Sequence, residues 1–162
     1  MRVGLNTGGE GMVEDLNRQR VLNFFDAFYS GETEAALACC DDEYDCLTHA
    51  PIELFPHLGH KHGKDWIAEA IRTQQERYSS RAYKIIFMSV DGAKVATTQH
   101  LSLRKRNDDR VVQLDVANFF TLRGGRILQH RTFFDSFDFV QQLLGQDLTD
   151  AFAAGVRDAI QR

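Results

Sequence analysis

The sequence predicts an α+β fold in which a curved antiparallel sheet packs against N-terminal helices and encloses one apolar pocket. Hydrophobic residues recur at helical spacing early in the chain, and they alternate with polar residues later. The alternating runs are joined by short turn sequences, namely Asp91-Gly92, Asn107-Asp108-Asp109 and Arg123-Gly124-Gly125. Such turns join antiparallel neighbours, and helices that precede the strands are typical of the α+β class.

The first part of the chain is expected to be mainly helical. The periodicity predicts helices at residues 13–29, 32–40 and 64–79, and a short strand at 44–49. Gly31 separates the first two helices, and Pro51 ends the strand. Residues 51–63 are expected to form a loop because they hold both prolines of the chain.

The second part is expected to be a four-stranded meander followed by two helices. The predicted strands are residues 82–90, 94–105, 110–122 and 126–134, and the predicted helices are 136–144 and 148–160. Residues 1–12 are rich in glycine and polar residues, which favours a disordered leader. We therefore expect a single domain over residues 13–162, with an extra C-terminal helix near 148–160.

Composition narrows the range of partners. The chain of 162 residues has a net charge of -4, whereas nucleic acids and anionic membranes select a basic face, so neither is an expected partner. No apolar run approaches the length that spans a bilayer, and no hydrophobic signal core is present near the start. The three cysteines include an adjacent pair and do not form a disulfide framework, which favours a reduced, cytoplasmic chain.

We expect no cofactor and no metal. The sequence contains no glycine-rich phosphate loop and no serine elbow motif. His57, His60 and His62 lie in the proline-containing segment, but no carboxylate or cysteine accompanies them at the spacing of metal ligands.

The strand predicted at 110–122 carries the clearest candidate for a functional residue. Its apolar face is interrupted once, by Asn118, in the series Val112, Leu114, Val116, Asn118, Phe120 and Leu122. An amide on such a face needs hydrogen-bond partners, because an unsatisfied buried polar group costs about 1–3 kcal/mol. Asn118 is therefore either a structural residue bonded within the core or a pocket residue that orients a ligand.

Two further polar residues accompany predicted apolar faces. Gln99 shares a face with Thr97, Leu101 and Leu103, and His49 shares one with Leu47 just before Pro51. His49 would lie at the rim of whatever the sheet encloses. A histidine there can be structural, but its imidazole titrates near neutral pH and could serve as a general base.

The order of these elements resembles the nuclear transport factor 2-like superfamily. Three segments carry the resemblance: VLNFFDAFYSGETEAALACCDDEY, THAPIELFPHLGHKHGKDWIAEAI and FFTLRGGRILQHRTFFDSFDFVQQLLG. They span residues 21–145 and are most similar to the SnoaL-like and ketosteroid-isomerase-like groups. The resemblance implies a cone-shaped, cystatin-like roll. It also implies several chemistries, since the superfamily includes isomerases, polyketide cyclases, epoxide hydrolases and members without catalysis.

The resemblance also assigns positions within the pocket. Where steroid isomerases carry an oxyanion-binding tyrosine, a base aspartate and a second oxyanion donor, this chain has Phe24, His49 and Asn118. Where epoxide hydrolases carry their charged triad, it has Gln99, Leu101 and Thr132. Both charged sets of these relatives are thus replaced.

Two functions remain open from the sequence. One is cofactor-independent isomerase, cyclase or hydrolase chemistry on a small apolar carbonyl compound, with His49 as general base and Asn118 as oxyanion donor. Gln99 and Thr132 would orient the substrate, and the pocket wall would comprise Phe24, Leu101, Leu114, Val116 and Phe134. This hypothesis requires His49 and Asn118 to point to the same side of the sheet. The alternative is a non-catalytic ligand-binding or dimerisation domain.

A homodimer is expected in either case. The second face of the 110–122 strand mixes polar and apolar side chains, which suits an interface between two copies: Gln113, Asp115, Ala117, Phe119 and Thr121.

Overall fold

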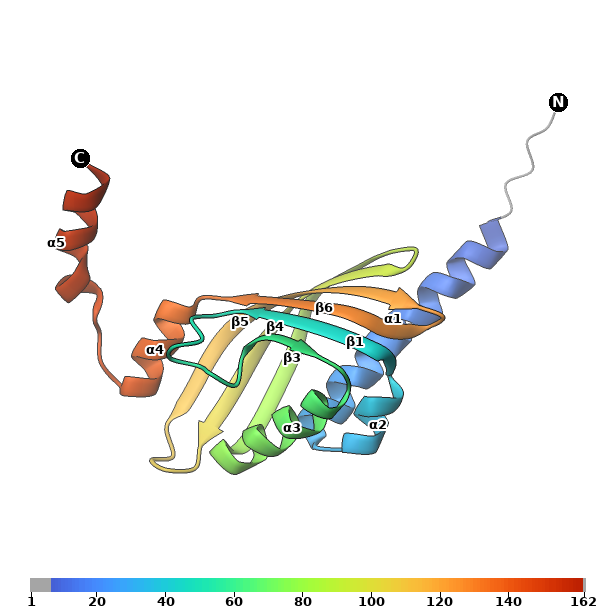
Figure 1. Ribbon diagram of the computed structural model, residues 1–162, viewed down its shortest axis with the longest axis horizontal. Coiled ribbons are helices and arrows are strands. Elements are labelled where there is room, and N and C mark those ends of the chain that lie inside the picture. The colour runs from blue at the N-terminus through green and yellow to red at the C-terminus, as the bar shows by residue number, and fades with distance from the viewer. Residues whose placement is uncertain (1–6, 162) are drawn as a thin grey trace.

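The computed structural model describes residues 7–161 and has an α+β architecture (Figure 1). In chain order the elements are α1 (Thr7–Ser30), α2 (Thr33–Ala38), β1 (Cys40–His49), β2 (Gly59–His62), α3 (Asp65–Arg77), β3 (Tyr78–Asp91), β4 (Lys94–Lys105), β5 (Val111–Arg123), β6 (Arg126–Phe134), α4 (Ser136–Leu144) and α5 (Thr149–Ile160). The predicted fold class is confirmed.

All six strands form one open sheet in the order β2-β1-β6-β5-β4-β3. The sheet is mixed: the meander β3–β6 is antiparallel, as expected, whereas β1 runs parallel to β6, with Thr48 opposite Thr132. Tight turns fix only the three consecutive pairs of the meander β3–β6. β1 reaches β6 through a long connection, which imposes no antiparallel direction.

The sheet is curved, and register shifts mark where its strands bend. One shift lies between Ile85 and Phe87 in β3, and another lies between Ile127 and Gln129 in β6, opposite Leu122 and Thr121 of β5. An extra residue at such a point bends the strand and increases its twist. The curvature leaves a concave face, which α1 and α3 cover (Figure 1).

Several elements differ from the sequence prediction, and β1 begins at Cys40 where residue 44 was expected. Helix α1 begins at Thr7, so residues 7–12 are helical and do not form a disordered leader; residues 1–6 lie outside the described part. The expected loop 51–63 contains β2, which pairs with β1. Strand β3 follows α3 directly at Tyr78. The first half of α1 also contacts the sheet, because Asn17 Nδ2 donates to Gly92 O at 2.9 Å in the β3–β4 turn.

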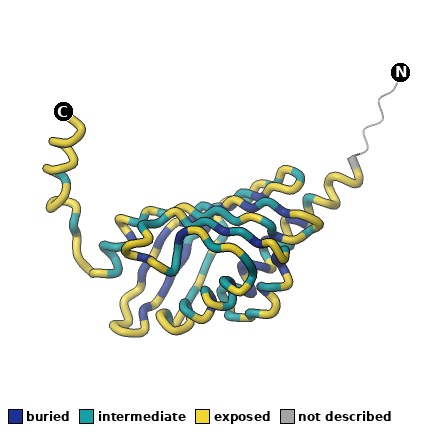
Figure 2. The backbone as a smooth tube through the Cα atoms, in the orientation of Figure 1, coloured by how far each residue is buried: buried dark blue, intermediate teal, exposed yellow. Residues whose placement is uncertain are grey.

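Burial follows the predicted alternation in the central strands. In β4 and β5 every second residue is buried on the concave side, as the dark bands in Figure 2 show. The core beneath them joins Val21 and Phe25 of α1, Tyr44 of β1 and Ile67 of α3. By contrast, none of the residues of α5 is buried, and this helix projects from the body (Figures 1 and 2).

No helix in the described part of the chain is long and apolar enough to cross a membrane. The single-domain boundary at residue 13 stays a prediction.

Candidate functional site

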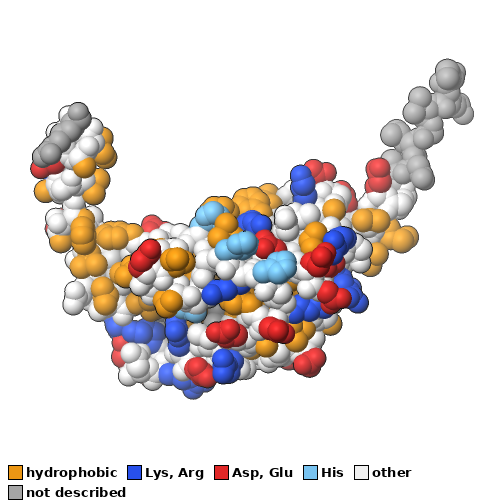
Figure 3. Space-filling view, viewed as in Figure 1, with side chains coloured by type: hydrophobic (Ala, Val, Ile, Leu, Met, Phe, Trp, Pro, Cys, Tyr) orange, Lys and Arg blue, Asp and Glu red, His pale blue; other side chains and the backbone are white. Residues whose placement is uncertain are grey.

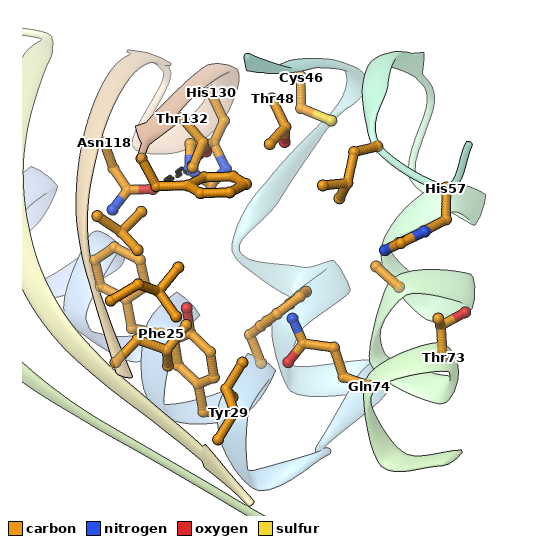
Figure 4. A pocket seen from close by; sticks show the side chains of 18 of the residues that line it. Phe25, Tyr29, Cys46, Thr48, His57, Thr73, Gln74, Asn118, His130 and Thr132 are labelled. Atoms are coloured by element: carbon orange, nitrogen blue, oxygen red, sulfur yellow. Dashed lines mark hydrogen bonds between the residues drawn. The ribbon is translucent and has the colours of Figure 1, made fainter. Parts of the chain in front are cut away.

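A cavity of about 150 Å³ lies between the concave face of the sheet and helices α1 and α3. Figure 4 shows the side chains around it, with Asn118, His130 and Thr132 on the sheet side and His57, Thr73 and Gln74 on the opposite side. Most of the lining is aromatic or aliphatic, from Phe24, Phe25, Phe28, Trp66, Leu101, Leu114, Val116, Phe134 and Phe139, among others.

The structure brings most of the residues singled out in the sequence to this cavity. Those that line it are Phe24, Leu101, Leu114, Val116, Asn118, Thr132 and Phe134. Gln99 is buried but does not line it. Its amide Nε2 donates to the hydroxyl of Tyr29 at 2.9 Å, and Tyr29 does line the cavity. Gln99 therefore reaches the site through Tyr29.

His49 lies on the other side of the sheet. Along β1 the side chains of Tyr44, Cys46 and Thr48 line the cavity, so the alternation of the strand turns His49 outward. There the imidazole stacks on the ring of Phe133, with centroids 4.1 Å apart. His49 and Asn118 thus point to different sides, and the paired roles expected for them require correction. The alternation along this strand predicts the outward position. His49 is an odd number of positions away from both Thr48 and Tyr44, so its side chain points to the opposite face of the sheet.

His130 is the histidine of the interior, and sequence reasoning missed it. Its Nδ1 lies 3.0 Å from the hydroxyl of Tyr44, and its Nε2 lies 2.9 Å from Asn118 Oδ1. The ring also stacks on Phe120 at 4.3 Å. The sequence contains a sign of this position. Thr132 and Phe134 were expected in the pocket, and His130 lies two residues before Thr132 on the same face of β6.

The hydrogen bonds assign the protons of this cluster. Asn118 Oδ1 accepts from Thr132 Oγ1 at 3.2 Å and from His130 Nε2–H. His130 Nδ1 is then the acceptor for the Tyr44 hydroxyl. Asn118 Nδ2 is left over: it is buried and has no hydrogen-bond partner among the described residues. Asn118 Nδ2 is therefore the unpaired donor of this cluster.

The cluster is electrically neutral near neutral pH. Burial, together with the nearby Arg131 guanidinium, lowers the pKa of His130 to about 3. Burial likewise raises the pKa of Tyr44 well above its ordinary value. No aspartate or glutamate lines the cavity. The uncharged cluster, with its one unpaired N–H donor, suits an uncharged oxygen acceptor. The permanent charge among the described lining residues is that of Arg77 at the end of α3.

The histidines of residues 51–63 lie in two different places, one at the cavity and one on the outer side of the sheet. His57 lines the cavity, and burial lowers its pKa, with Arg77 and Lys61 adding to the effect. His60 Nε2 lies 2.6 Å from Asp45, which also contacts Arg131 at 2.7 Å. These outer groups are separated from the cavity by the sheet.

The curved open sheet with its helix-covered cavity defines the nuclear transport factor 2-like class. Within that class the chain belongs to the SnoaL-like domain family, whose model matches residues 21–130. No protein of curated function matches the chain.

Solved structures of the same fold are numerous. A provisionally assigned isomerase from Rhodopseudomonas palustris is 25% identical, with a TM-score of 0.72, and the match covers 80% of this chain and 97% of that one. An LEH-like epoxide hydrolase from Mycobacterium tuberculosis is 22% identical, with a TM-score of 0.68 and coverage of 86% and 98%. A protein described as a SnoaL-like polyketide cyclase, from Jannaschia sp. CCS1, is 15% identical, with a TM-score of 0.70 and coverage of 86% and 96%.

The lowered pKa of His130 predicts a pH dependence of stability. Unfolded histidine takes up a proton below about pH 6.5, whereas folded His130 does so only near its pKa of about 3. The contribution of His130 to the free energy of unfolding is therefore complete above pH 6.5. It declines as the pH falls and is about 2 kcal/mol smaller at pH 5. Chemical denaturation at pH 5 and above pH 6.5 should show that the free energy of unfolding falls less between the two conditions for His130→Gln than for the wild type. His100→Gln, a control on the outer face, should retain the wild-type loss. Equal losses in all three proteins would contradict the assignment.

Proposed function

We propose that this protein binds a small, mainly apolar molecule with one oxygen acceptor in the central cavity. The observation that supports the proposal most strongly is the buried Asn118 Nδ2, which has no partner among the described residues. A buried donor without a partner costs about 1–3 kcal/mol, and a ligand oxygen would remove that cost. The hydrogen bonds that Asn118 Oδ1 accepts from His130 and Thr132 hold the amide in place for this role.

The size and polarity of the cavity favour a ring-sized ligand. A cavity of about 150 Å³ lined by apolar side chains is large enough for a molecule of about the size of benzene. The aromatic side chains of Phe24, Phe25 and Phe134 would contact such a ring from several sides. The ligand would thus be anchored by one hydrogen bond and selected mainly by shape.

The binding proposal has a direct test with acetophenone and ethylbenzene, which differ chiefly in the carbonyl oxygen. Calorimetry should find acetophenone bound about tenfold more tightly, because only it can accept from Asn118. Asn118→Leu, which keeps the branched shape of the side chain and removes its polar atoms, should remove this preference. Gln113→Leu, which replaces an exposed amide on the other face of β5, should keep it. A preference that survives in Asn118→Leu would rule out the anchor.

Cofactor-independent acid–base catalysis is a second candidate, now centred on His130 in place of His49. It is favoured by the position of His130 at the cavity wall, bonded to both Tyr44 and Asn118. The likeness to the isomerase from Rhodopseudomonas palustris is consistent with it. However, a ring with a pKa of about 3 and partners on both nitrogens is a weak base, so we favour binding.

Deuterium exchange would distinguish the two candidates. In a catalytic site, His130 would remove a methyl proton of acetophenone and the enolate would reprotonate from D₂O. Proton NMR should then show exchange that the wild type accelerates and His130→Gln does not. We expect binding without acceleration, and accelerated exchange that depends on His130 would favour the enzyme.

We also propose that the uncovered sheet face joins two copies of the chain. Figure 3 shows histidine and apolar side chains on that face, over the strands β1 and β2. Phe119 and Phe133 contact each other there and are 50% and 41% exposed, which is unusual for phenylalanine. The three free, buried cysteines are consistent with a cytoplasmic location.

The dimer has a simple test. Light scattering should give twice the chain mass for the wild type, and Phe119→Asp should reduce the mass to that of one chain because a carboxylate would be buried at the interface. Glu10→Gln, an exposed change far from the sheet face, should leave the dimer intact. A wild-type monomer would contradict the proposal.

A further inference from the structure

Arg77 is the one residue with a permanent charge among those that line the cavity. It ends α3, and its Nη1 lies 3.3 Å from Nε2 and 3.4 Å from Nδ1 of His57. Arg77 forms no ion pair with any carboxylate in the described part of the chain, unlike Arg123 and Arg131. The charge of Arg77 is therefore available to a ligand.

His57 helps to hold Arg77 in position. Burial lowers the pKa of His57, as do the neighbouring cations Arg77 and Lys61. The ring is consequently neutral near neutral pH and can accept a hydrogen bond from the guanidinium. Because His57 also lines the cavity, this contact keeps the cation at the cavity margin.

A second cavity of about 370 Å³ continues the site beyond Arg77. The two cavities share His57, Arg77, Tyr78 and Phe139. The outer one adds two cations and one acid, namely Lys105, Arg106 and Glu76. Lys105 forms an ion pair with Asp108 at 2.9 Å. Arg106 forms no ion pair within residues 7–161, and its Nε donates a hydrogen bond to Gln75 O. The margin of the site is therefore positive, although the whole chain carries a net charge of -4.

A second unpartnered polar atom lies on the same side as Arg77. Gln74 Oε1 is buried without a hydrogen-bond partner in the described structure, and Gln74 precedes Arg77 by three residues on the same face of α3. Figure 4 shows Gln74 and Asn118 on opposite sides of the cavity, with apolar side chains between them. The site thus has a polar group at each end and an apolar middle.

We propose that the ligand is an aromatic or alicyclic carboxylic acid that also carries a carbonyl or hydroxyl oxygen. The second oxygen accepts from Asn118 Nδ2, the ring occupies the apolar middle, and the carboxylate pairs with Arg77 at the margin. Arginine suits this role because its planar guanidinium can donate two parallel hydrogen bonds to a carboxylate. This inference rests on the proposed binding function and names its ligand class.

The probes for the test are 4-acetylphenylacetate and its uncharged methyl ester, which share the ring and the acetyl group. Calorimetry on the full chain should find the acid bound about tenfold more tightly than the ester, because the charged pair adds to the hydrogen bond. Arg77→Gln should abolish this difference and leave the ester affinity within about twofold. Added salt should weaken binding of the acid only.

A matched control lies on the same helix. Arg72 is exposed and does not line either cavity, so Arg72→Gln should leave both affinities unchanged. Thermal denaturation should confirm that both variants fold, since Arg77 is also exposed.

The outcomes separate the two proposals. If the ester binds in a manner that depends on Asn118 and the acid has no advantage, the carboxylate inference is overturned and pocket binding stands. The same holds if the advantage of the acid survives Arg77→Gln. If neither probe binds, the binding function is overturned, and the carboxylate inference with it.

Discussion

The hydrogen bond between His130 Nε2 and Asn118 Oδ1 is the contact on which the rest of the site depends. It uses the amide oxygen, so the nitrogen is left as the free donor. It also fixes the tautomer of His130, whose Nδ1 then accepts from Tyr44. Burial keeps the ring uncharged, which allows an imidazole to remain inside an aromatic interior between Phe24 and Phe120.

The curvature of the sheet explains why this polar cluster faces a cavity and not a filled core. Strands β5 and β6 place Asn118 and Thr132 directly opposite each other, while the register shift after Thr121 bends the sheet beside them. Helices α1 and α3 cover the concave face, and α3 brings Gln74 and Arg77 to the far side. The polar groups are consequently separated by apolar side chains, as a molecule with two polar ends would require.

The alternation of residues predicted much of this arrangement. The pattern in 110–122 identified Leu114, Val116 and Asn118 on one face, and all three line the cavity. Alternation along β1 and β6 also places Thr48 and Thr132 on the cavity side, with His49 facing outward and His130 facing the cavity. The parallel pairing of β1 with β6 could not be read from the sequence, because no turn joins these two strands. The role of Arg77 was equally hidden, since only the fold brings the end of α3 to the cavity.

The direct measurement of the central claim is a high-resolution crystal structure of the protein with acetophenone. The account predicts the carbonyl oxygen at about 2.7–3.2 Å from Asn118 Nδ2, with the ring between the phenylalanine side chains and the His130–Asn118 hydrogen bond retained. A bound ring whose oxygen points away from Asn118, or an amide nitrogen already bonded to a protein group in that structure, would contradict it.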